Sequence, residues 1–133
     1  MEEFKVETSS QFEIVDLTPQ IEKILQEEEL KEGLIFIFVP HTTCALILTE
    51  NEENLKKDFL KLFKKLTENI EFSHNLIDDN ASAHLFSSLF GQEKLLMVEN
   101  QKLVLGTWQR LCLLELDGPR QRNVYFKFIK TSQ

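Results

Sequence analysis

The stretch LIFIFVPHTTCALILT, residues 34–49, decides the fold class, because two apolar runs flank a short polar break. The runs at 34–39 and 44–49 are short, rich in branched and aromatic residues, and almost free of polar side chains. They predict two strands that are buried on both faces. The break between them carries Pro40, His41 and a threonine pair. Because loops on rigid scaffolds often carry binding and catalytic groups, His41 is a candidate functional residue.

Working outward from this stretch, the pattern predicts both strands and helices. Further strands are expected at 2–8, 12–17, 94–99, 102–116 (interrupted near Gly106) and 122–130, and helices from Thr18-Pro19 to a stop at Gly33, at 52–66 and at 82–90. The first two strands are compatible with a hairpin about Ser9 and Ser10. In the helix at 52–66, Leu55, Phe59, Leu62, Phe63 and Leu66 form one apolar face.

This order of elements is neither a βαβ alternation nor all-β, so the fold class is α+β, with mostly antiparallel sheets and about three short helices. No linker or repeat interrupts the chain, and residues 1–133 are expected to form one domain. The apolar surface of these strands is larger than three short helices can cover. Either another copy of the chain covers the remaining sheet face, or two sheets cover each other.

Composition excludes several classes of function. A formal net charge of −7 argues against nucleic acid as a partner, because phosphate contacts need clustered lysine and arginine. No apolar run is long enough for a membrane helix, and the acidic N-terminus does not fit a signal peptide. Cys44 and Cys112 lie in apolar strands without metal or redox spacing, so we expect reduced core thiols in a cytoplasmic protein.

Three regions carry candidate chemistry. The chain has three histidines, His41, His74 and His84, whose spacing matches no local metal motif. On the helix at 82–90, His84 shares an uncharged arc with Ser87 and Ser88. That arc fits the lining of a pocket or, equally, a tightly packed contact of small residues between helices.

The other candidate segments are LGTWQRL (105–111), where Gly106 suggests a bulge, and ELDGPRQR (115–122), where a turn delivers Arg120 and Arg122 beside Glu115. An arginine at such a turn either binds a phosphate through its fork or is a solvated surface residue. Arg122 is expected to face the other side of the strand and to contribute little to anion binding.

Several of these motifs occur together in one order. They are HTTCAL (41–46), Glu50-Asn51, Asp58, His74, NASAHL (80–85), SSLFG (87–91), LGTWQ (105–109) and ELDGPR (115–120). Their combination resembles the YjbQ family, also called UPF0047, over roughly residues 4–130. The resemblance implies a YjbQ-like α+β fold that assembles as a homotrimer. It also implies a thiamine-phosphate synthase activity, which joins a pyrimidine diphosphate to a thiazole phosphate.

The resemblance further implies that His41, His74 and His84 converge around a metal or an anionic ligand, with residues of a neighbouring subunit as possible contributors. Three imidazoles suit Zn²⁺, whereas a diphosphate substrate usually travels with Mg²⁺. The expected substrate-binding residues are Thr42, Thr43, Ser87, Ser88, Thr107, Trp108, Gln109, Glu115 and Arg120. Zinc-dependent hydrolysis of a small phosphorylated metabolite, with Glu50 or Asp58 as general base, is an alternative, as is a trimer that binds a metal or metabolite without catalysis.

Overall fold

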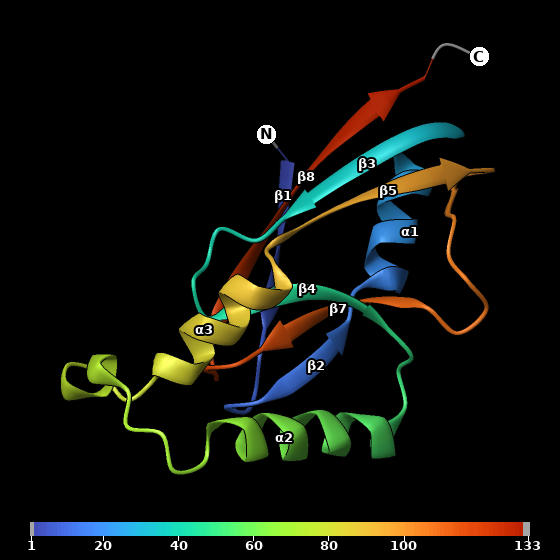
Figure 1. The fold of residues 1–133 in the computed structure, drawn as a ribbon. Coiled ribbons are helices and arrows are strands. Elements are labelled where there is room, and N and C mark those ends of the chain that lie inside the picture. Colours follow the sequence, from blue (N-terminus) through green and yellow to red (C-terminus); the bar gives the residue numbers. More distant parts are fainter. Residues whose placement is uncertain (1, 132–133) are drawn as a thin grey trace.

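The computed structural model describes residues 2–131 and builds them into two antiparallel sheets and three α-helices (Figure 1). The larger sheet has the order β1-β8-β3-β5-β6 and the smaller one the order β2-β7-β4. The strands are β1 (Glu2–Glu7), β2 (Glu13–Asp16), β3 (Glu32–Phe38), β4 (Cys44–Thr49), β5 (Glu93–Glu99), β6 (Lys102–Leu103), β7 (Arg110–Glu115) and β8 (Gln121–Lys130). The helices are α1 (Thr18–Glu27), α2 (Glu53–Thr67) and α3 (Ala81–Phe90), with a short 3₁₀ helix, η1, at Ser73–Leu76. The α+β prediction is confirmed.

The small sheet is the middle layer of the molecule, and its alternating side chains build two cores. Leu46, Leu111 and Leu113 point toward the large sheet and α1 and belong to the main core. Ala45 and Cys112 belong to the second core, which also holds Phe63 of α2 and Phe86 of α3. The period of two along each strand is what directs alternate residues to opposite faces. The small sheet therefore separates the large sheet from the layer of α2 and α3.

The two N-terminal strands do not form a hairpin. β1 pairs with β8 in the large sheet, while β2 pairs with β7 in the small sheet. The segment about Ser9 and Ser10 instead crosses from one sheet to the other. It passes Gly118 so closely that a Cβ on that residue would lie 2.3 Å from the carbonyl oxygen of Ser10. This short connection thus leads the chain from the large sheet to the small sheet and does not form a hairpin turn between paired strands.

The end of α1 differs from the prediction at Gly33. The helix ends at Glu27, and a Schellman motif follows, in which the Leu30 N–H donates to the Leu25 carbonyl and Glu29 takes a φ of 54°. Gly33 lies instead in β3, where a Cβ would stand 2.5 Å from the carbonyl oxygen of Ile129. The glycine therefore serves close strand packing, and a glutamate supplies the left-handed residue of the helix end.

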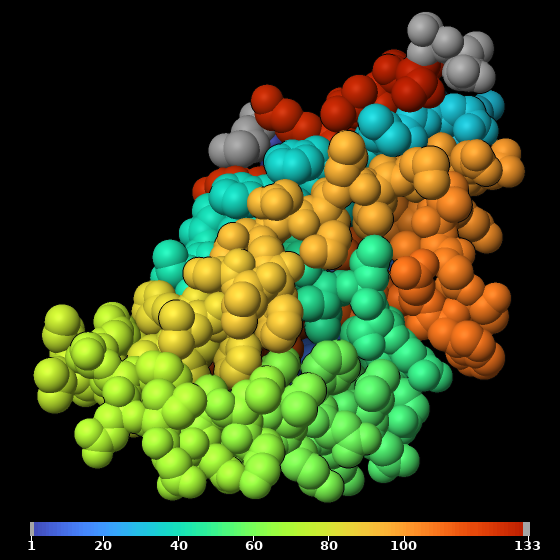
Figure 2. Space-filling model, in the orientation of Figure 1, coloured from blue at the N-terminus to red at the C-terminus, as the bar shows by residue number. Residues whose placement is uncertain are grey.

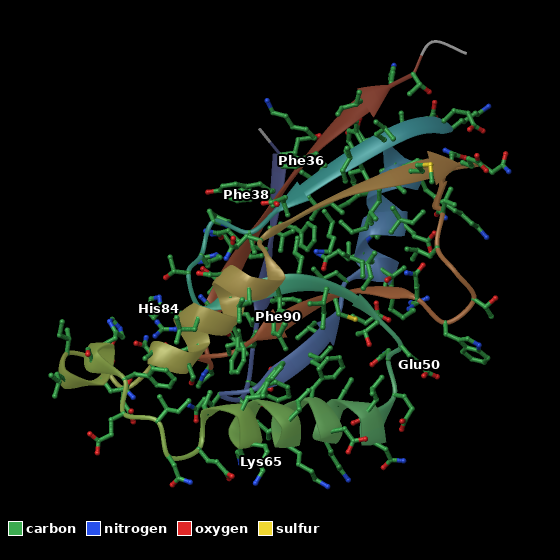
Figure 3. All side chains as sticks on the ribbon, in the orientation of Figure 1. Phe36, Phe38, Glu50, Lys65, His84 and Phe90 are labelled. Atoms are coloured by element: carbon green, nitrogen blue, oxygen red, sulfur yellow. The ribbon has the colours of Figure 1, made fainter. Side chains whose placement is uncertain are left out.

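The outer face of the large sheet is uncovered in the single chain. It carries the exposed apolar side chains Phe36, Leu95, Met97 and Ile129, and we call these four residues the outer sheet face. Figure 3 labels Phe36 and Phe38 on β3. The prediction that residues 34–39 are buried on both faces is therefore wrong for one chain, since only Ile35, Ile37 and Val39 of that run belong to the main core.

The apolar face predicted for α2 is only partly buried. In α2, Phe63 is buried against the second core, but Leu62 and Leu66 of the predicted apolar face are exposed. The predicted existence of the helix is confirmed, and Glu52 caps it by accepting from the backbone N–H groups of Asn54 and Leu55.

Within residues 2–131, no helix combines the length and apolarity that a membrane crossing requires.

Candidate functional site

A buried ion pair between β7 and β8 forms the base of the candidate site. Glu115 is 0% exposed and Arg122 is 3% exposed, and the Arg122 guanidinium donates to both carboxylate oxygens of Glu115. Burial is the largest single influence and would lower the pKa of Arg122, but the hydrogen bonds to Glu115 and the neighbouring negative charges together outweigh it, so the pKa is raised. Arg122 thus lies in the interior and not on the exposed turn that carries Arg120, and its small contribution to anion binding stays a prediction. Arg122 is a buried structural cation.

The pair also fixes the loops that carry the candidate residues. Arg122 donates to the carbonyl and to the hydroxyl of Thr43, at 3.0 and 2.8 Å, and so anchors the segment that holds His41. The Glu115 carboxylate accepts from the hydroxyl of Thr8 at 2.7 Å and from the backbone N–H of Asp117 at 3.3 Å. Thr43 and Glu115 were predicted to bind substrate. Both are buried, and their side chains are already hydrogen-bonded to Arg122. They therefore hold the loops of the site in place.

His41 follows β3 and is tied to β8. Its Nε2 atom accepts the backbone N–H of Asn123 at 2.9 Å, so the lone pair of that nitrogen is occupied and the proton of the neutral ring lies on Nδ1. Burial is the main cause that lowers the pKa of His41, and the nearby Arg122 lowers it further. His41 is therefore held as a neutral ring that braces the first part of β8.

A chain of hydrogen bonds leads from the DGPR turn to the second histidine. Arg120 donates from Nη2 to Asp117 Oδ2 at 3.1 Å, and Asn80 Nδ2 donates to the same carboxylate oxygen at 2.9 Å. The Asn80 Oδ1 atom lies 2.8 Å from Nε2 of His74. Because an amide oxygen only accepts, His74 carries its proton on Nε2, and its Nδ1 lone pair remains available for a ligand or a proton.

His84 stands beside His74 at the start of α3. The two ring centroids are 4.8 Å apart, with the rings nearly edge to face. Both line a pocket of about 380 Å³ together with Phe72, Ser73, Ala81 and Leu85. We call it the histidine pocket. A pair of imidazoles at one pocket can bind a metal or an anion, or exchange protons with a bound molecule.

The serines of α3 divide between two roles. Ser87 is 0% exposed, and its hydroxyl donates to the carbonyl of Cys44 and accepts from the Gln92 side chain. Ser87 therefore makes a tight contact, but with strand β4 and not with another helix as one of the two predictions had it, because a small residue lets α3 approach β4 closely. Ser88 is exposed and lies one turn beyond His84, so it remains a candidate contact for a ligand.

Four of the remaining predicted residues lie at the other end of the small sheet. The register of β4 and β7 places Cys44 opposite Glu115 at one end and Thr49 opposite Arg110 at the other. These ends are roughly 17 Å apart along six-residue strands. At the far end are Glu50, Thr107, Trp108 and Gln109, and Figure 3 shows Glu50 on the opposite side from His84.

Within one chain, neither the four residues at the far end of the small sheet nor Asp58 lies beside the histidines. Trp108 is 72% exposed, and Gln109 closes its own turn by accepting the N–H of Gly106 at 2.8 Å. In Figure 2 the orange segment that contains these residues lies at the opposite edge from the yellow-green segment that precedes α3. Asp58 is exposed on α2. A single chain therefore holds two separate groups of candidate residues.

A zinc site of three histidines is not assembled by one chain. Within residues 2–131, no group of three or more histidine, cysteine, aspartate or glutamate side chains could hold a metal ion. His74 and His84 provide two neighbouring imidazoles, but the Nε2 atom of His41 is engaged with the backbone. Metal binding by this donor set would need a further ligand from outside the chain, since zinc sites usually have at least three protein ligands.

Comparisons with known proteins decide the family. The model described as UPF0047 protein YjbQ-like matches residues 2–131. The chain belongs to the YjbQ (UPF0047) family. It is 41% identical to a UPF0047 protein of Archaeoglobus fulgidus, over 94% of this chain and 98% of that protein. It is 36% identical to the UPF0047 protein YugU of Bacillus subtilis, over 94% of this chain and 96% of that protein.

Solved structures agree with this membership. A crystal structure of a YbjQ-like protein from Sulfolobus solfataricus P2 superposes with a TM-score of 0.90 at 42% identity, covering 98% of this chain and 96% of that one. A YjbQ/UPF0047 protein from Clostridium acetobutylicum gives a TM-score of 0.89 at 32% identity, covering 97% and 100%. The YjbQ-like fold expected from the sequence motifs is therefore confirmed.

Two residues of this YjbQ-family site were not singled out from the sequence. Asn80 and Asp117 connect Arg120 to His74, although neither was named as a candidate. Both stand inside motifs that were noticed, NASAHL and DGPR. A turn aspartate and a residue before a helix have common local uses, as a turn former and an N-cap. Those uses concealed a contact between side chains that are 37 residues apart.

Proposed function

We propose that this YjbQ-family protein is an enzyme that acts on a small phosphorylated metabolite at the histidine pocket. The observation that supports it most strongly is the chain Arg120–Asp117–Asn80–His74, which ends beside His84. It gives one imidazole a defined tautomer and keeps a guanidinium near the same end of the sheet. Fixed hydrogen bonds of this kind orient catalytic and ligand-binding histidines.

The reaction that we propose is the one that the family resemblance implies, the joining of a pyrimidine methyl diphosphate to a thiazole phosphate. Its physical requirement is neutralisation of the charge that develops on the leaving diphosphate. Arg120 and the exposed hydroxyls of Thr42 and Ser88 are suitable donors for it. A divalent metal would add charge neutralisation when bound: Zn²⁺ on the histidines, or Mg²⁺ carried by the diphosphate.

We further propose that the working site is completed in a homotrimer. Two observations support this proposal: Glu50 and Trp108 lie at the other end of the small sheet from the histidines, and the outer sheet face is apolar and exposed. A neighbouring subunit could cover the outer sheet face and supply, in the assembly, the side chains that one chain holds away from its histidines. Because both thiols are buried and unpaired, we also propose a cytoplasmic location.

Turnover by the purified protein tests the proposed function. The protein is incubated with both substrates and with Zn²⁺, Mg²⁺ or a chelator, and thiamine phosphate and pyrophosphate are measured. We expect product with wild type, at least tenfold less with His84→Ala, and unchanged product with Leu89→Ala, an exposed position on the same helix. Release of inorganic phosphate without thiamine phosphate would favour a hydrolase, and binding without turnover would indicate a non-catalytic role.

Subunit mixing tests the shared site. Inactive His84→Ala and Glu50→Ala proteins are unfolded together and refolded as a mixture. If each site takes its histidines from one subunit and Glu50 from the next, one site in each mixed trimer regains both residues, which is about a quarter of all sites in an equal mixture. Activity should then return from two inactive parents. No recovery would show that the two groups of residues do not cooperate across subunits.

A further inference from the structure

A second pocket lies on the other side of α3 from the histidines. It occupies about 380 Å³ between α2, α3 and the segment before β2. Figure 2 shows the green residues of α2 running alongside the yellow residues of α3. The two pockets share α3: Ala81, His84 and Leu85 line the histidine pocket, while Ser82, Ala83 and Phe86 line the second pocket. We call this second pocket the phenylalanine pocket.

Three aromatic rings form the wall of the phenylalanine pocket. Phe63 and Phe86 stack with ring centroids 4.6 Å apart, and Phe12 meets Phe63 edge to face at 5.8 Å. The pocket opens to solvent beside these rings, so a bound apolar group would remove apolar surface from water. Its volume lies within the range of roughly 300–1,000 Å³ that is usual for small-molecule sites. The wall is therefore suited to an apolar ring or a short apolar chain.

The rim of the same pocket is suited to an anion. Lys64 lines it and has no carboxylate within ion-pair distance among the residues that the structure describes, whereas the next lysine, Lys65, pairs with Glu68. The first turn of α3 also borders the pocket. In the described part of the chain no group accepts from the Ser82 and Ala83 backbone N–H groups, and Asn80 provides no side-chain cap. A negative charge here would meet an ammonium and the positive end of a helix.

We propose that the phenylalanine pocket binds a small amphipathic carboxylate, with its apolar part on the phenylalanine wall and its carboxylate toward Lys64 and the first turn of α3. On a chain of net charge −7, an anion binds only where local donors exceed the general repulsion, and this rim supplies them. The site is separate from the histidine pocket, so the proposal does not rest on the proposed catalytic reaction. Occupancy would fix the helix that carries His84.

Titration with 2-naphthoate tests this site, and 2-naphthylmethanol serves as the neutral probe of matched shape. Calorimetry measures affinity, and backbone amide shifts locate the probe. We expect saturable binding of one naphthoate per chain, weaker binding of the alcohol, and shifts in α2 and α3. Lys64→Gln should weaken naphthoate binding about two- to fivefold, the range of an exposed ionic contact, whereas Lys61→Gln, on α2 but outside the pocket, should not.

Two filling variants complete the test. Ser82→Trp and Thr67→Trp place bulk on opposite walls of the pocket, and each should abolish naphthoate binding while the amide spectrum stays folded. Having two such variants keeps the test valid if one of them fails to fold. The proposal is overturned by absence of saturable binding, by equal affinity in Lys64→Gln, or by shifts on the outer sheet face instead. A change of sedimented mass in the filling variants would also overturn it, because it would identify the pocket as a contact between copies.

Discussion

His74 and Asn80 are joined by a hydrogen bond of 2.8 Å between Nε2 and Oδ1, and this contact determines which nitrogen of the imidazole is free. Asn80 cannot turn its amide around, because its Nδ2 atom is held by Asp117 at 2.9 Å. The aspartate is held in turn by Arg120. The orientation of the His74 ring in the histidine pocket thus depends on the turn at Asp117, 43 residues further along the chain.

Replacing Asn80 with alanine should release the His74 ring. We expect the imidazole of wild type to show one tautomer, with the proton on Nε2, and that of Asn80→Ala to show a mixture. Nitrogen NMR of the histidine rings measures this directly. Any turnover should fall about 10- to 100-fold, as is usual when the partner of an active-site histidine is removed. Asn54→Ala, at an exposed position on α2, is the control, and identical ring signals in wild type and Asn80→Ala would contradict the role of Asn80.

Removing Arg122 should strongly destabilise the fold. Arg122→Met leaves the Glu115 carboxylate buried without its cation, which should lower the free energy of unfolding by about 3–5 kcal/mol. Urea unfolding measures the change. Arg120→Met breaks an exposed pair and should cost at most about 1 kcal/mol.

The double variant Arg122→Met with Glu115→Leu separates loss of a partner from loss of packing. Because it leaves no unpaired charge in the core, it should recover much of the lost stability. If the double variant is as unstable as Arg122→Met, the pair contributes through its contacts to Thr43 and Thr8 rather than through charge compensation.

These two residues also show how far the sequence allowed prediction of the site. The strand pattern placed Glu115 and Arg122 on consecutive strands, and the turn between them was recognised, but it did not show that these strands belong to different sheets. Whether an arginine at alternate positions of β8 points into the core depends on the register with β1 and β3, which comes from strands far away in the sequence. The DGPR motif therefore located the turn correctly, but the different roles of Arg120 and Arg122 could be assigned only once the strand register of the large sheet was known.

The same limit applies to the apolar runs. Local periodicity identified the three α-helices and nearly every strand of the described residues, but not the 3₁₀ helix η1, because periods of two and 3.6 are properties of regular strands and α-helices. It did not show that β1 and β2 enter different sheets, or that Leu62 and Leu66 face outward from α2. Those outcomes depend on which elements pack together, and for the outer sheet face they depend on what lies outside the chain.

Stability should fall with acid in a way that depends on His41. Its pKa lies below the usual 6.5 in the folded protein, mainly because of burial and then because of Arg122. As the pH drops through 6.5, the unfolded chain takes up the proton and the native ring does not, so native stability decreases until the pH reaches the folded pKa. Urea unfolding at several pH values should show a smaller decrease in His41→Gln. Equal pH profiles would mean that His41 is not held neutral.

Self-association should depend on the outer sheet face. Met97 is 58% exposed on β5, and replacing it with glutamate puts a charge into the proposed trimer contact. We expect wild type to sediment as a trimer at micromolar concentration and Met97→Glu as a monomer. Leu62→Glu has a similar starting exposure of 54% on α2 and should remain a trimer. A monomeric wild type, or trimers in both variants, would refute the role of this face.

Anion binding at the histidine end should depend on the arginine fork of Arg120. The side chain of Arg120 is 51% exposed, and it donates from Nε to the Asp117 carbonyl at 2.7 Å and from Nη2 to the Asp117 carboxylate at 3.1 Å. Asp117 therefore fixes one edge of the guanidinium and leaves the rest of the fork to an incoming phosphate. Arg120→Lys retains the positive charge but loses both the fixed edge and the parallel donors.

We expect Arg120→Lys to weaken pyrophosphate binding by about 1 kcal/mol, the low end of the range for hydrogen bonds to charged groups, because one edge of the fork is already used and the site is half exposed. Arg110→Lys is the matched control, since Arg110 pairs with Asp16 at 2.7 Å at the opposite end of β7. Calorimetric titration with pyrophosphate compares the two variants with wild type. Because an effect of general charge would act at both ends of the strand, equal losses in the two variants would refute a local anion site, as would absence of binding by wild type. A loss confined to Arg120→Lys would place the phosphate beside the DGPR turn, within reach of the residues that hold His74.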